Sequence, residues 1–380
     1  MSEPTEPWPL LDQPGSLSQP QPAAAGRCPT CSYPVTAYAM FCEGCGAPLL
    51  PSASPPEHTG TRTTSTRTQR LAVAAATPCV ECGGTVDADG YCQTCGAKAP
   101  NPRDHLEFSP ADWVAGVTDR GVARSRNEDA VAVWAAPQGQ RAVLVVSDGV
   151  STSIDSDAAS LAAVNSACEV LAALPDELSE TDAAAALVAA AAGANRAVIA
   201  TTLTDSVNAA SATFAAAVVH GDTVHLASLG DSRIYWISAT SQLALTVDDS
   251  MAQAFIEQGM PRDEAESMPT AHAITKWLGR DSDDVAPRTS CHRITDDGWL
   301  LVCSDGLWNY ASTPAALGSQ VVAALTGDPT PLEVSRRLVA WANAQGGHDN
   351  VTVAVAWCRA TLGTPVAAQA DAGKGLHSNG

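Results

Sequence analysis

Residues 143–149 read VLVVSDG, a short run of apolar and β-branched side chains that ends on a carboxylate and a glycine. Four further segments place acidic residues beside a β-like apolar run in the same way. These segments are Asn127-Glu128-Asp129, Gly230-Asp231-Ser232-Arg233, Ser304-Asp305-Gly306 and His348-Asp349-Asn350. Because strand ends deliver side chains to one edge of a sheet, we expect the carboxylates to meet in one cleft.

Carboxylates that are crowded into one cleft repel one another, and each raises the pKa of the others. Such an arrangement persists in a folded protein when bound cations neutralise the negative charge. The five acidic segments therefore predict a site for more than one metal ion.

The composition limits the class of protein and of partner. The chain has 380 residues, of which 45% are hydrophobic, and this is enough for one large core and smaller modules. Its formal net charge is −20, so a nucleic-acid duplex would be repelled. The longest apolar stretch, residues 183–192, is short for a bilayer, and the first residues do not resemble a secretion signal. We expect a cytoplasmic protein that binds neither nucleic acid nor membranes.

Eight of the twelve cysteines lie in four Cys-x-x-Cys pairs within the first hundred residues. Four thiolates in two such pairs are typical of a closed structural zinc site, whereas disulfides fit poorly in a reducing cytoplasm. We therefore predict two structural Zn²⁺ ions, although the pairs could also combine across the two repeats. One ion is assigned to Cys28, Cys31, Cys42 and Cys45, and the other to Cys79, Cys82, Cys92 and Cys95.

Composition and periodicity divide the chain into six segments. We predict a disordered tail at 1–26, a zinc ribbon at 27–50, a Thr-rich linker at 51–77, a second zinc ribbon at 78–100, a large domain at 108–360 and a disordered tail at 361–380. Within the large domain, helices are predicted at 157–174, 181–203, 314–325 and 331–343, and a helical excursion at 250–278. Strands are predicted at 212–219, 224–229, 234–237, from 299, and at 351–357.

The acidic motifs, in their order, resemble the metal-dependent (type 2C) serine/threonine protein phosphatases. The matching residues are Arg124-x-x-Asn127-Glu128-Asp129, Asp148-Gly149, Gly230-Asp231-Ser232-Arg233, Ser304-Asp305-Gly306-Leu307-Trp308 and Asp349-Asn350-Val351-Thr352. One Asp-Gly alone is more often a turn than a ligand, but five matched segments argue against coincidence. The resemblance covers about Trp113 to Trp357. It implies an α/β (α+β) fold, a four-layer α-β-β-α sandwich of two mainly antiparallel sheets flanked by helices.

The resemblance also implies which residues hold metal. Two Mn²⁺ or Mg²⁺ ions would be bridged by Asp148 and by a water molecule, and hard oxygen ligands suit both ions. Glu128 and the backbone carbonyl of Gly149 would serve one ion. Asp305 and Asp349 would hold the other.

Two further acidic residues have alternative interpretations. Asp129 is either a weaker ligand or an organiser of the other ligands. Asp231 stands where this family can recruit a third ion, and the alternative is a turn aspartate beside Arg233.

The implied reaction is hydrolysis of phosphoserine and phosphothreonine by direct attack of the bridging water. Arg124 is the candidate phosphate clamp, because a guanidinium offers a planar fork to two phosphate oxygens. The family usually has His or Met after Asp-Gly, whereas this chain has Val150, which cannot protonate the leaving group. His272 and Lys276 lie in a segment similar to the family's mobile flap, and they either touch the phosphoprotein or have a plain surface role.

Two classes of function remain open. The first is a phosphatase acting on phosphorylated Ser/Thr proteins, with a serine/threonine kinase and its substrates as partners and with zinc ribbons for docking. The second is a zinc-ribbon adaptor whose phosphatase-like domain binds phosphoproteins but catalyses weakly or not at all. Every proposed metal ligand is retained, so we favour the enzyme. The linker carries six threonines between Thr59 and Thr68, which suits either a solvated spacer or a kinase target.

Overall fold

The computed structural model describes residues 26–27, 34–35, 78–87, 90–97, 99, 101–153, 155–202 and 208–360. Contacts divide the chain into two units, residues 1–74 and 75–380. In the first unit, the described part is an antiparallel pair of short strands, β1 (Gly26–Arg27) and β2 (Pro34–Val35). The predicted first zinc site (Cys28, Cys31, Cys42 and Cys45), the Thr-rich linker, the C-terminal tail and nearly all of the N-terminal tail lie outside the described residues.

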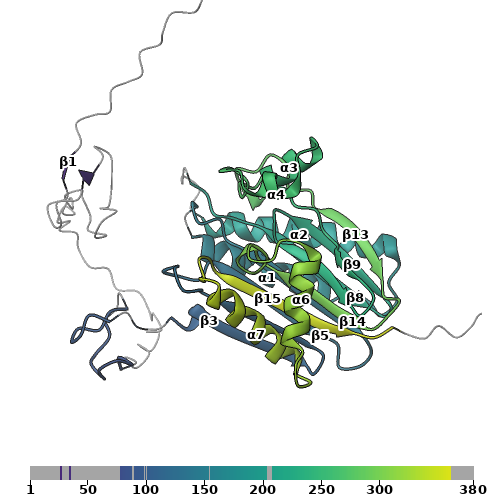
Figure 1. Ribbon diagram of the computed structural model, residues 1–380, viewed down its shortest axis with the longest axis horizontal. Coiled ribbons are helices and arrows are strands. Elements are labelled where there is room, and N and C mark those ends of the chain that lie inside the picture. Colours follow the sequence, from purple (N-terminus) through teal and green to yellow (C-terminus); the bar gives the residue numbers. More distant parts are fainter. Residues whose placement is uncertain are drawn as a thin grey trace, which may run out of the picture. The chain divides into compact units, whose positions relative to one another are not determined.

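The described part of the second unit is built on two antiparallel sheets (Figure 1). The six-stranded sheet has the order β11 (Gln242–Ala244), β10 (Arg233–Ser238), β14 (Gly298–Cys303), β15 (Val351–Cys358), β4 (Val114–Asp119) and β3 (His105–Ala111). The five-stranded sheet has the order β13 (Arg288–Arg293), β9 (Thr223–Leu229), β8 (Phe214–His220), β6 (Arg141–Asp148) and β5 (Asp129–Ala135). Two further short strands, β7 (Ser211–Ala212) and β12 (Leu278–Gly279), pair with each other and form a separate two-stranded sheet.

An apolar core fills the space between the two sheets. Leu144, Leu226, Ile234, Trp236 and Leu300 are fully buried members of this core. Strand β6, which carries the VLVVSDG run, lies between β5 and β8 and is covered on both faces. A strand that is buried on both faces reads as a continuous apolar run instead of alternating, which explains the sequence of β6.

Helices cover the outer face of each sheet. The five-stranded sheet packs against α1 (Ser156–Ala172) and α2 (Glu180–Thr201), and the six-stranded sheet against α5 (Asp305–Trp308), α6 (Pro314–Ala324) and α7 (Pro331–Ala344). Figure 1 shows α6 and α7 lying across the sheet that contains β15. The predicted four-layer α-β-β-α sandwich is therefore confirmed.

Local sequence signals place the starts of three helices. Ser179, Thr313 and Thr330 each accept a hydrogen bond from the backbone N–H three residues later, and proline occupies the first position of α6 and α7. By length and composition α2 is apolar enough to cross a membrane. Its face with Leu187 and Val198 is nevertheless buried in the core of the sandwich, which accounts for that composition.

The segment from 250 to 278 leaves the sheets and carries two short helices. These are α3 (Met251–Glu257) and α4 (Arg262–Glu266), which Figure 1 shows projecting beyond the sandwich. The Ser250 hydroxyl begins α3 by accepting from the backbone N–H of Gln253. The predicted helical excursion is thus helical in its first half, and after Glu266 the chain runs in turns to β12.

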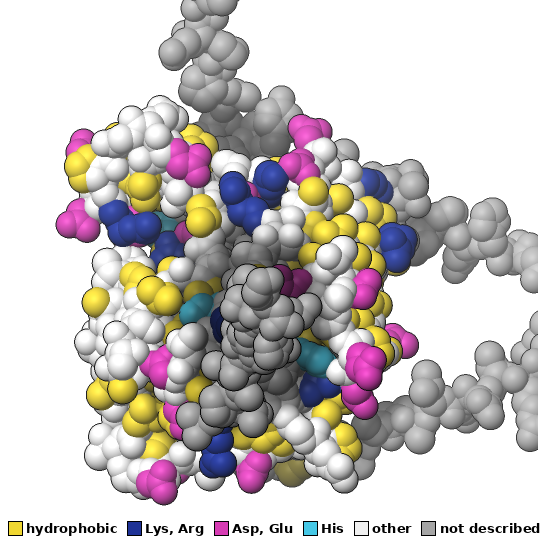
Figure 2. Space-filling model, turned by 90° about the vertical axis from the view of Figure 1, so that its right-hand side faces the viewer, with side chains coloured by type: hydrophobic (Ala, Val, Ile, Leu, Met, Phe, Trp, Pro, Cys, Tyr) yellow, Lys and Arg dark blue, Asp and Glu magenta, His cyan; other side chains and the backbone are white. Residues whose placement is uncertain are grey.

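Three edge strands, β3, β11 and β13, were not predicted from the sequence. Strand β3 follows a 3-10 helix (Pro102–Asp104) and begins three residues before the predicted domain start at 108. Strand β13 is mostly exposed, and its polar sequence lacks an apolar run. On the face in Figure 2, the described acidic and basic side chains are interspersed, and hydrophobic ones occur in small groups, as is usual on a protein surface.

Candidate active site

The five acidic segments meet at one end of the sandwich. Strand β5 begins at Asp129 and β6 ends at Asp148, and these two residues are direct partners across the antiparallel pair. Asp305 follows β14 as the first residue of α5, and Asp349 stands two residues before β15. Asp231 lies in the turn between β9 and β10. The expected gathering of carboxylates in one place is therefore present in the structure.

Burial and mutual repulsion dominate the electrostatics of this cluster. Burial raises the pKa of Asp148 well above its ordinary value, and the charges of Asp129, Asp305, Asp231 and Asp349 raise it further. Burial, with the charges of Asp349 and Asp305, raises the pKa of Asp129 to about 7. The pKa of Asp305 rises to about 6 because of burial and the charge of Asp349. The folded chain thus holds acids that cannot all ionise near pH 7 without a neutralising cation.

The donor groups of the cluster fit divalent cations. Asp129 Oδ2 accepts from the Ser304 hydroxyl at 2.6 Å, and Asp305 Oδ2 accepts from Asn309 Nδ2 at 2.9 Å. The second oxygen of each carboxylate, Oδ1, is buried and has no hydrogen-bond partner among the described residues. A buried carboxylate oxygen without a donor is costly, and Mn²⁺ and Mg²⁺ bind to oxygen ligands of this kind.

Glu128 is held in place by several donors. Its Oε1 accepts from Arg126 Nη2 at 2.5 Å and from the Ser156 hydroxyl at 2.6 Å. Burial raises the pKa of Glu128, but hydrogen bonds from Ser156, Ser151 and Arg126 outweigh it and leave the pKa lowered. Unlike Asp129, Asp148 and Asp305, Glu128 is therefore stabilised as a carboxylate by the protein itself.

Gly149 has no room for a side chain. Its N–H donates to Glu128 O at 3.1 Å, and a Cβ would lie 2.4 Å from Ser156 O and 2.7 Å from Glu128 O. The backbone can approach the start of α1 and the Glu128 segment this closely because residue 149 is glycine. The sequence Asp148-Gly149 is thus explained by packing as well as by the implied carbonyl ligand.

Asn350 links three of the segments. Its Oδ1 accepts from Glu128 N at 2.8 Å, and its Nδ2 donates to Arg120 O at 2.8 Å and to Arg126 O at 2.9 Å. A Cβ at Gly306 would lie 1.9 Å from Asn350 O, so α5 also packs directly on this residue. Asn350 therefore holds the loop before β5 against the start of β15.

Arg124, the predicted phosphate clamp, lies beside the cluster. Its Nη2 donates to Asp349 Oδ2 at 2.5 Å, and its Nη1 donates to Ser151 Oγ at 3.3 Å. Burial lowers its pKa, but the hydrogen bond and charge of Asp349, with smaller contributions from Glu128 and Asp148, leave the pKa raised. The side chain is 37% exposed, so the guanidinium is accessible from outside the cluster.

Asp231 lies at a small cavity of about 140 Å³ between the cluster and the 250–278 segment. Gly230 has φ +98°, which fits the turn interpretation of Asp231. Arg233 does not pair with Asp231 but with Asp248, through Nη2 to Oδ2 at 2.7 Å, and it lies over the Trp308 ring. Burial and the charges of Asp305 and Asp248 raise the pKa of Asp231 well above its ordinary value. The third-ion interpretation stays a prediction.

The two flap residues have different surroundings. His272 lines the same cavity as Asp231, and its ring centroid is 6.4 Å from that of Trp308. Lys276 instead forms an ion pair with Asp284, with 2.5 Å between Nζ and Oδ2. Val150 donates its backbone N–H to Ser211 O, and its side chain offers no proton, as expected.

Several residues that organise the site were not identified from the sequence. Arg126, which was not among the predicted site residues, binds Glu128. Ser156, Ser304, Asn309 and Asn350 each hold a carboxylate or its backbone in place. Ser304 and Asn350 adjoin acidic residues inside the quoted motifs, which is the signal that could have identified them. Ser156 and Asn309 carry no such signal.

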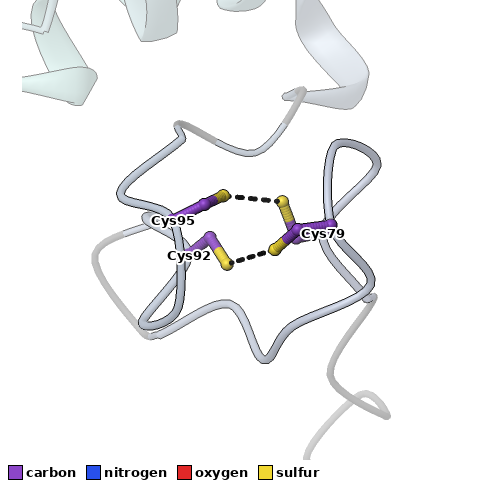
Figure 3. A group of neighbouring side chains, drawn as sticks. Cys79, Cys92 and Cys95 are labelled. Atoms are coloured by element: carbon purple, nitrogen blue, oxygen red, sulfur yellow. Dashed lines mark hydrogen bonds between the residues drawn. The ribbon is translucent and has the colours of Figure 1, made fainter.

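The second cysteine cluster has the geometry of a four-sulfur metal site. The sulfur atoms of Cys79, Cys82, Cys92 and Cys95 all lie within 4.8 Å of one another. The Sγ atoms of Cys79 and Cys95 are 3.7 Å apart, and those of Cys82 and Cys92 are 3.5 Å apart (Figure 3). Four thiolates arranged tetrahedrally at 2.3 Å from a zinc ion would have sulfurs about 3.8 Å apart.

Backbone geometry supports the same interpretation. Gly83 N donates to Cys79 O at 2.8 Å, and Gly96 N donates to Cys92 O at 2.8 Å, with both glycines at positive φ. Each Cys-x-x-Cys pair therefore makes the same tight turn. Backbone N–H groups of Cys95 and Thr94 lower the pKa of Cys92 to about 6, whereas the pKa values of Cys82 and Cys95 are raised beside the neighbouring thiols, so without a cation the cluster favours a thiolate at Cys92.

Comparisons with known proteins agree with the fold and the site. Residues 120–341 match the model of the protein phosphatase 2C family. Over 244 residues the chain is 29% identical to the serine/threonine protein phosphatase PstP of Mycobacterium tuberculosis, covering 64% of this chain and 44% of PstP. The chain spans about half the length of the curated relatives it matches.

Solved structures show the same similarity. The serine/threonine phosphatase of S. agalactiae superposes with a TM-score of 0.57 and 26% identity, over 67% of this chain and 100% of that one. The catalytic domain of PstP in complex with two manganese ions gives a TM-score of 0.50 and 28% identity, over 64% of this chain and 96% of that one. The residues that match the family model include the whole five-stranded sheet, strands β10, β11 and β14 of the six-stranded sheet, and four of the five acidic segments. This chain therefore belongs to the protein phosphatase 2C family.

Proposed function

We propose that this chain hydrolyses phosphoserine and phosphothreonine in proteins with the help of two Mn²⁺ or Mg²⁺ ions. The observation that carries the proposal is the pair of buried carboxylate oxygens, Asp129 Oδ1 and Asp305 Oδ1, which have no hydrogen-bond partner among the described residues. They lie in a cluster where burial and neighbouring charges raise the pKa of Asp148. Membership in the protein phosphatase 2C family supports the reaction class.

We assign the ions to the residues that the motifs indicate. Asp148 would be shared, Glu128 and the Gly149 carbonyl would serve one ion, and Asp305 and Asp349 the other. A bound pair of this kind would supply Lewis-acid polarisation of the phosphate and a lowered pKa for the attacking water. The manganese pair in the related PstP domain supports the choice of metal.

The protein's own groups would position the phosphate. Arg124 reaches Asp349 with Nη2 and the Ser151 hydroxyl with Nη1, so phosphate oxygens entering here would compete with Ser151 for a guanidinium already held in place. A fixed planar fork loses little conformational entropy when it binds an anion. Arg126 is engaged by Glu128, so we assign it to holding that carboxylate and not to the substrate.

We also propose that the cysteine clusters bind structural zinc and that the ribbons dock other proteins. The sulfur spacing and the two glycine turns of the second cluster support this. A partner serine/threonine kinase, and the substrates of that kinase, would supply the phosphoproteins. In the part of the chain that the structure describes, all eight cysteines are free, which supports a reducing compartment such as the cytoplasm.

The test is metal-dependent hydrolysis of a phosphothreonine peptide by the full chain. We expect turnover with Mn²⁺, and a loss of about 10³-fold or more in the Asp148→Asn variant, because the shared ligand is removed. Asp176→Asn, an exposed carboxylate that pairs with Arg141, is the matched control and should keep wild-type turnover.

Two results would separate the enzyme from the phosphoprotein-binding adaptor. Saturable binding of the phosphopeptide without turnover in the wild type would support the adaptor. Equal turnover in wild type and Asp148→Asn would show that the activity does not come from this cluster. Circular dichroism of each variant establishes that the sandwich is folded.

A further inference from the structure

A second cavity, of about 710 Å³, lies at the other end of the strands that carry the acidic cluster. Trp299, the second residue of β14, and Trp357, the last but one of β15, line the cavity. The opposite ends of these two strands lie close in sequence to Asp305 and Asp349. At 3.3 Å per residue these strands separate the two places by about 20 Å. The cavity is therefore not part of the site that would bind phosphate.

Three tryptophans and two prolines belong to the apolar part of its wall. Trp113, Trp299, Trp357, Pro329 and Pro331 all line the cavity. Trp299 and Trp357 are direct partners across β14 and β15, with ring centroids 5.2 Å apart and planes tilted by 54°. The backbone N–H of Trp357 donates to Trp113 O at 2.8 Å, which joins the third indole to the same sheet edge.

Hydrogen bonds of the Gln140 side chain hold one side of the cavity in place. Gln140 Nε2 donates to Gly221 O at 2.6 Å and to Arg359 O at 3.0 Å, while Gln140 Oε1 accepts from Arg359 N at 2.7 Å. On the other side, Thr330 caps α7 and Pro331 begins it. A cavity that is formed in advance binds a ligand without the entropic cost of ordering its own walls.

Several polar groups around the cavity make no hydrogen bond or ion pair with described residues, so they are available to a ligand. Three indole N–H groups make no hydrogen bond with described residues, those of Trp113, Trp299 and Trp357. None of these nitrogen atoms is fully buried, so each can be reached from outside. The side chains of Asp112, Asp328 and Arg359 line the same cavity and form no ion pair with a described residue. Two acids against one base leave the rim acidic. Asp328 also has φ +54°, an uncommon conformation for a non-glycine residue.

These features match one kind of ligand. A proline-rich segment in the polyproline II conformation has no N–H at its prolines, so its carbonyls need donors, and its flat rings pack on aromatic faces. Aromatic-lined grooves bind such segments in other proteins. The indole N–H groups would supply the donors, and the acidic rim would favour a basic residue in the segment. The volume lies within the range of about 300–1,000 Å³ that is usual for binding pockets.

We propose that this cavity, the tryptophan groove, binds a proline-rich, basic segment of a partner protein. The groove would then hold a partner or substrate protein at one end of the sandwich while the acidic cluster faces its phosphorylated residue from the other. Nothing in this proposal depends on catalysis, because binding is measured without turnover.

The test is fluorescence anisotropy of a labelled peptide of six prolines preceded by one arginine, titrated with the full chain. We expect saturable binding that weakens about tenfold or more in Trp113→Ala, because aromatic anchors dominate interfaces of this kind. Trp134→Phe, a half-buried tryptophan on the other sheet, is the matched control and should bind like the wild type. Circular dichroism shows whether each variant is folded.

If Trp113→Ala does not fold, substitutions of the exposed residues Asp112 and Asp328 still test the proposal. We expect Asp328→Asn to reduce the preference for the arginine peptide over one that begins with glutamate, with little change for prolines alone. Absence of saturable binding to the wild type, or equal binding by wild type and a folded Trp113→Ala, overturns the proposal. An unchanged arginine preference in the Asp112→Asn/Asp328→Asn double variant overturns the role of the acidic rim.

Discussion

The acidic cluster and the second cysteine cluster are both candidate metal sites, but they depend on their surroundings in opposite ways. The acidic cluster lies at the end of a sandwich whose inter-sheet core, with Trp236 and Leu144, is closed without it. In the described part of the second ribbon, Cys79 and Cys92 are buried while Val80 is 67% exposed and Tyr91 is 48% exposed. Cys82 and Cys95 are exposed, so the buried interior of this part of the ribbon consists of two of the four cysteines and not of large apolar side chains.

This difference concerns what each metal would do. In the sandwich, the fold holds carboxylates together against their repulsion, so a cation would relieve strain that the fold creates. In the ribbon, a cation would create the fold, because a module of this size cannot bury enough apolar surface to be stable alone. The following predictions test this contrast, from the largest expected effect to the smallest.

The largest effect should follow removal of one sulfur ligand. We expect Cys92→Ser to bind one zinc ion fewer per chain and to unfold the second ribbon, since structural zinc contributes on the order of 10 kcal/mol to such modules. Metal analysis of the purified chain and the amide signal of Tyr91 are the measurements. Cys291→Ser, an exposed cysteine on β13, is the control. Unchanged zinc content, or loss of the sandwich fold in the same variant, would contradict the contrast.

The next effect concerns activity without loss of fold. We expect Asp305→Asn to lower kcat/KM on a phosphothreonine peptide about 10³-fold, which corresponds to about 4 kcal/mol, because a ligand of one ion is removed. The tryptophan fluorescence of the sandwich should be unchanged, in contrast to the ribbon. Glu177→Gln, an exposed acid outside the site, is the control. If Asp305→Asn lost its fold together with its activity, the sandwich would depend on its metal ligands for folding, as the ribbon is expected to do.

The metal-free sandwich should lose stability as the pH rises. Burial, together with the charges of Asp349 and Asp305, raises the pKa of Asp129 from 3.8 to about 7, so the folded state binds more protons than the unfolded state between these values. The free energy of unfolding therefore falls as the pH rises through that range. Asp129→Asn removes this group and should stabilise the metal-free chain at pH 7 by on the order of 2 kcal/mol.

Urea denaturation in EDTA at pH 5 and at pH 7.5, followed by tryptophan fluorescence, measures this effect. Asp176→Asn is again the control, and Mn²⁺ should abolish the pH dependence in the wild type. Stability of the metal-free wild type that increases with pH would show that the carboxylates do not repel one another as the structure indicates.

The smallest predicted effect concerns the phosphate clamp. We expect Arg124→Lys to lower kcat/KM about tenfold, because lysine keeps the charge but loses the planar fork. Arg336→Lys, on an exposed arginine that pairs with Glu107, should change nothing. Steady-state kinetics at saturating Mn²⁺ is the measurement. An Arg124→Lys variant with wild-type kcat/KM would remove this residue from the proposed binding of phosphate.

Much of the fold could be predicted from local patterns. The predicted helix at 157–174 is α1, the one at 331–343 is α7, and the strand at 224–229 is β9, each within two residues at either end. All three have clear apolar patterns, and α7 also has a side-chain cap at Thr330, whereas α1 begins without one. Strands β3 and β13 were missed because edge strands are exposed, and their sequences carry no apolar run to indicate pairing.

The site was predicted in part, for a related reason. The acidic residues stand at strand ends, so their order along the chain already indicated that they meet. The partners of these residues could not be predicted, because they come from distant segments: Arg124 and Asp349 are 225 residues apart, and Ser304 and Asp129 are 175 apart. The pairing of Arg233 with Asp248 instead of Asp231 was also decided by packing.

By itself, the sequence determined that this protein has strands ending in carboxylates and cysteine pairs with metal-binding spacing, since both patterns depend on neighbours along the chain. The tertiary structure decided which oxygens are left without donors, and that Arg124 bonds to Asp349 while Arg126 bonds to Glu128. It also decided that two tryptophans on strands and one in the turn between β3 and β4 share one cavity. These outcomes depend on strand register and on how helices pack on the sheets. Such contacts form between residues far apart in sequence, and no local pattern records them.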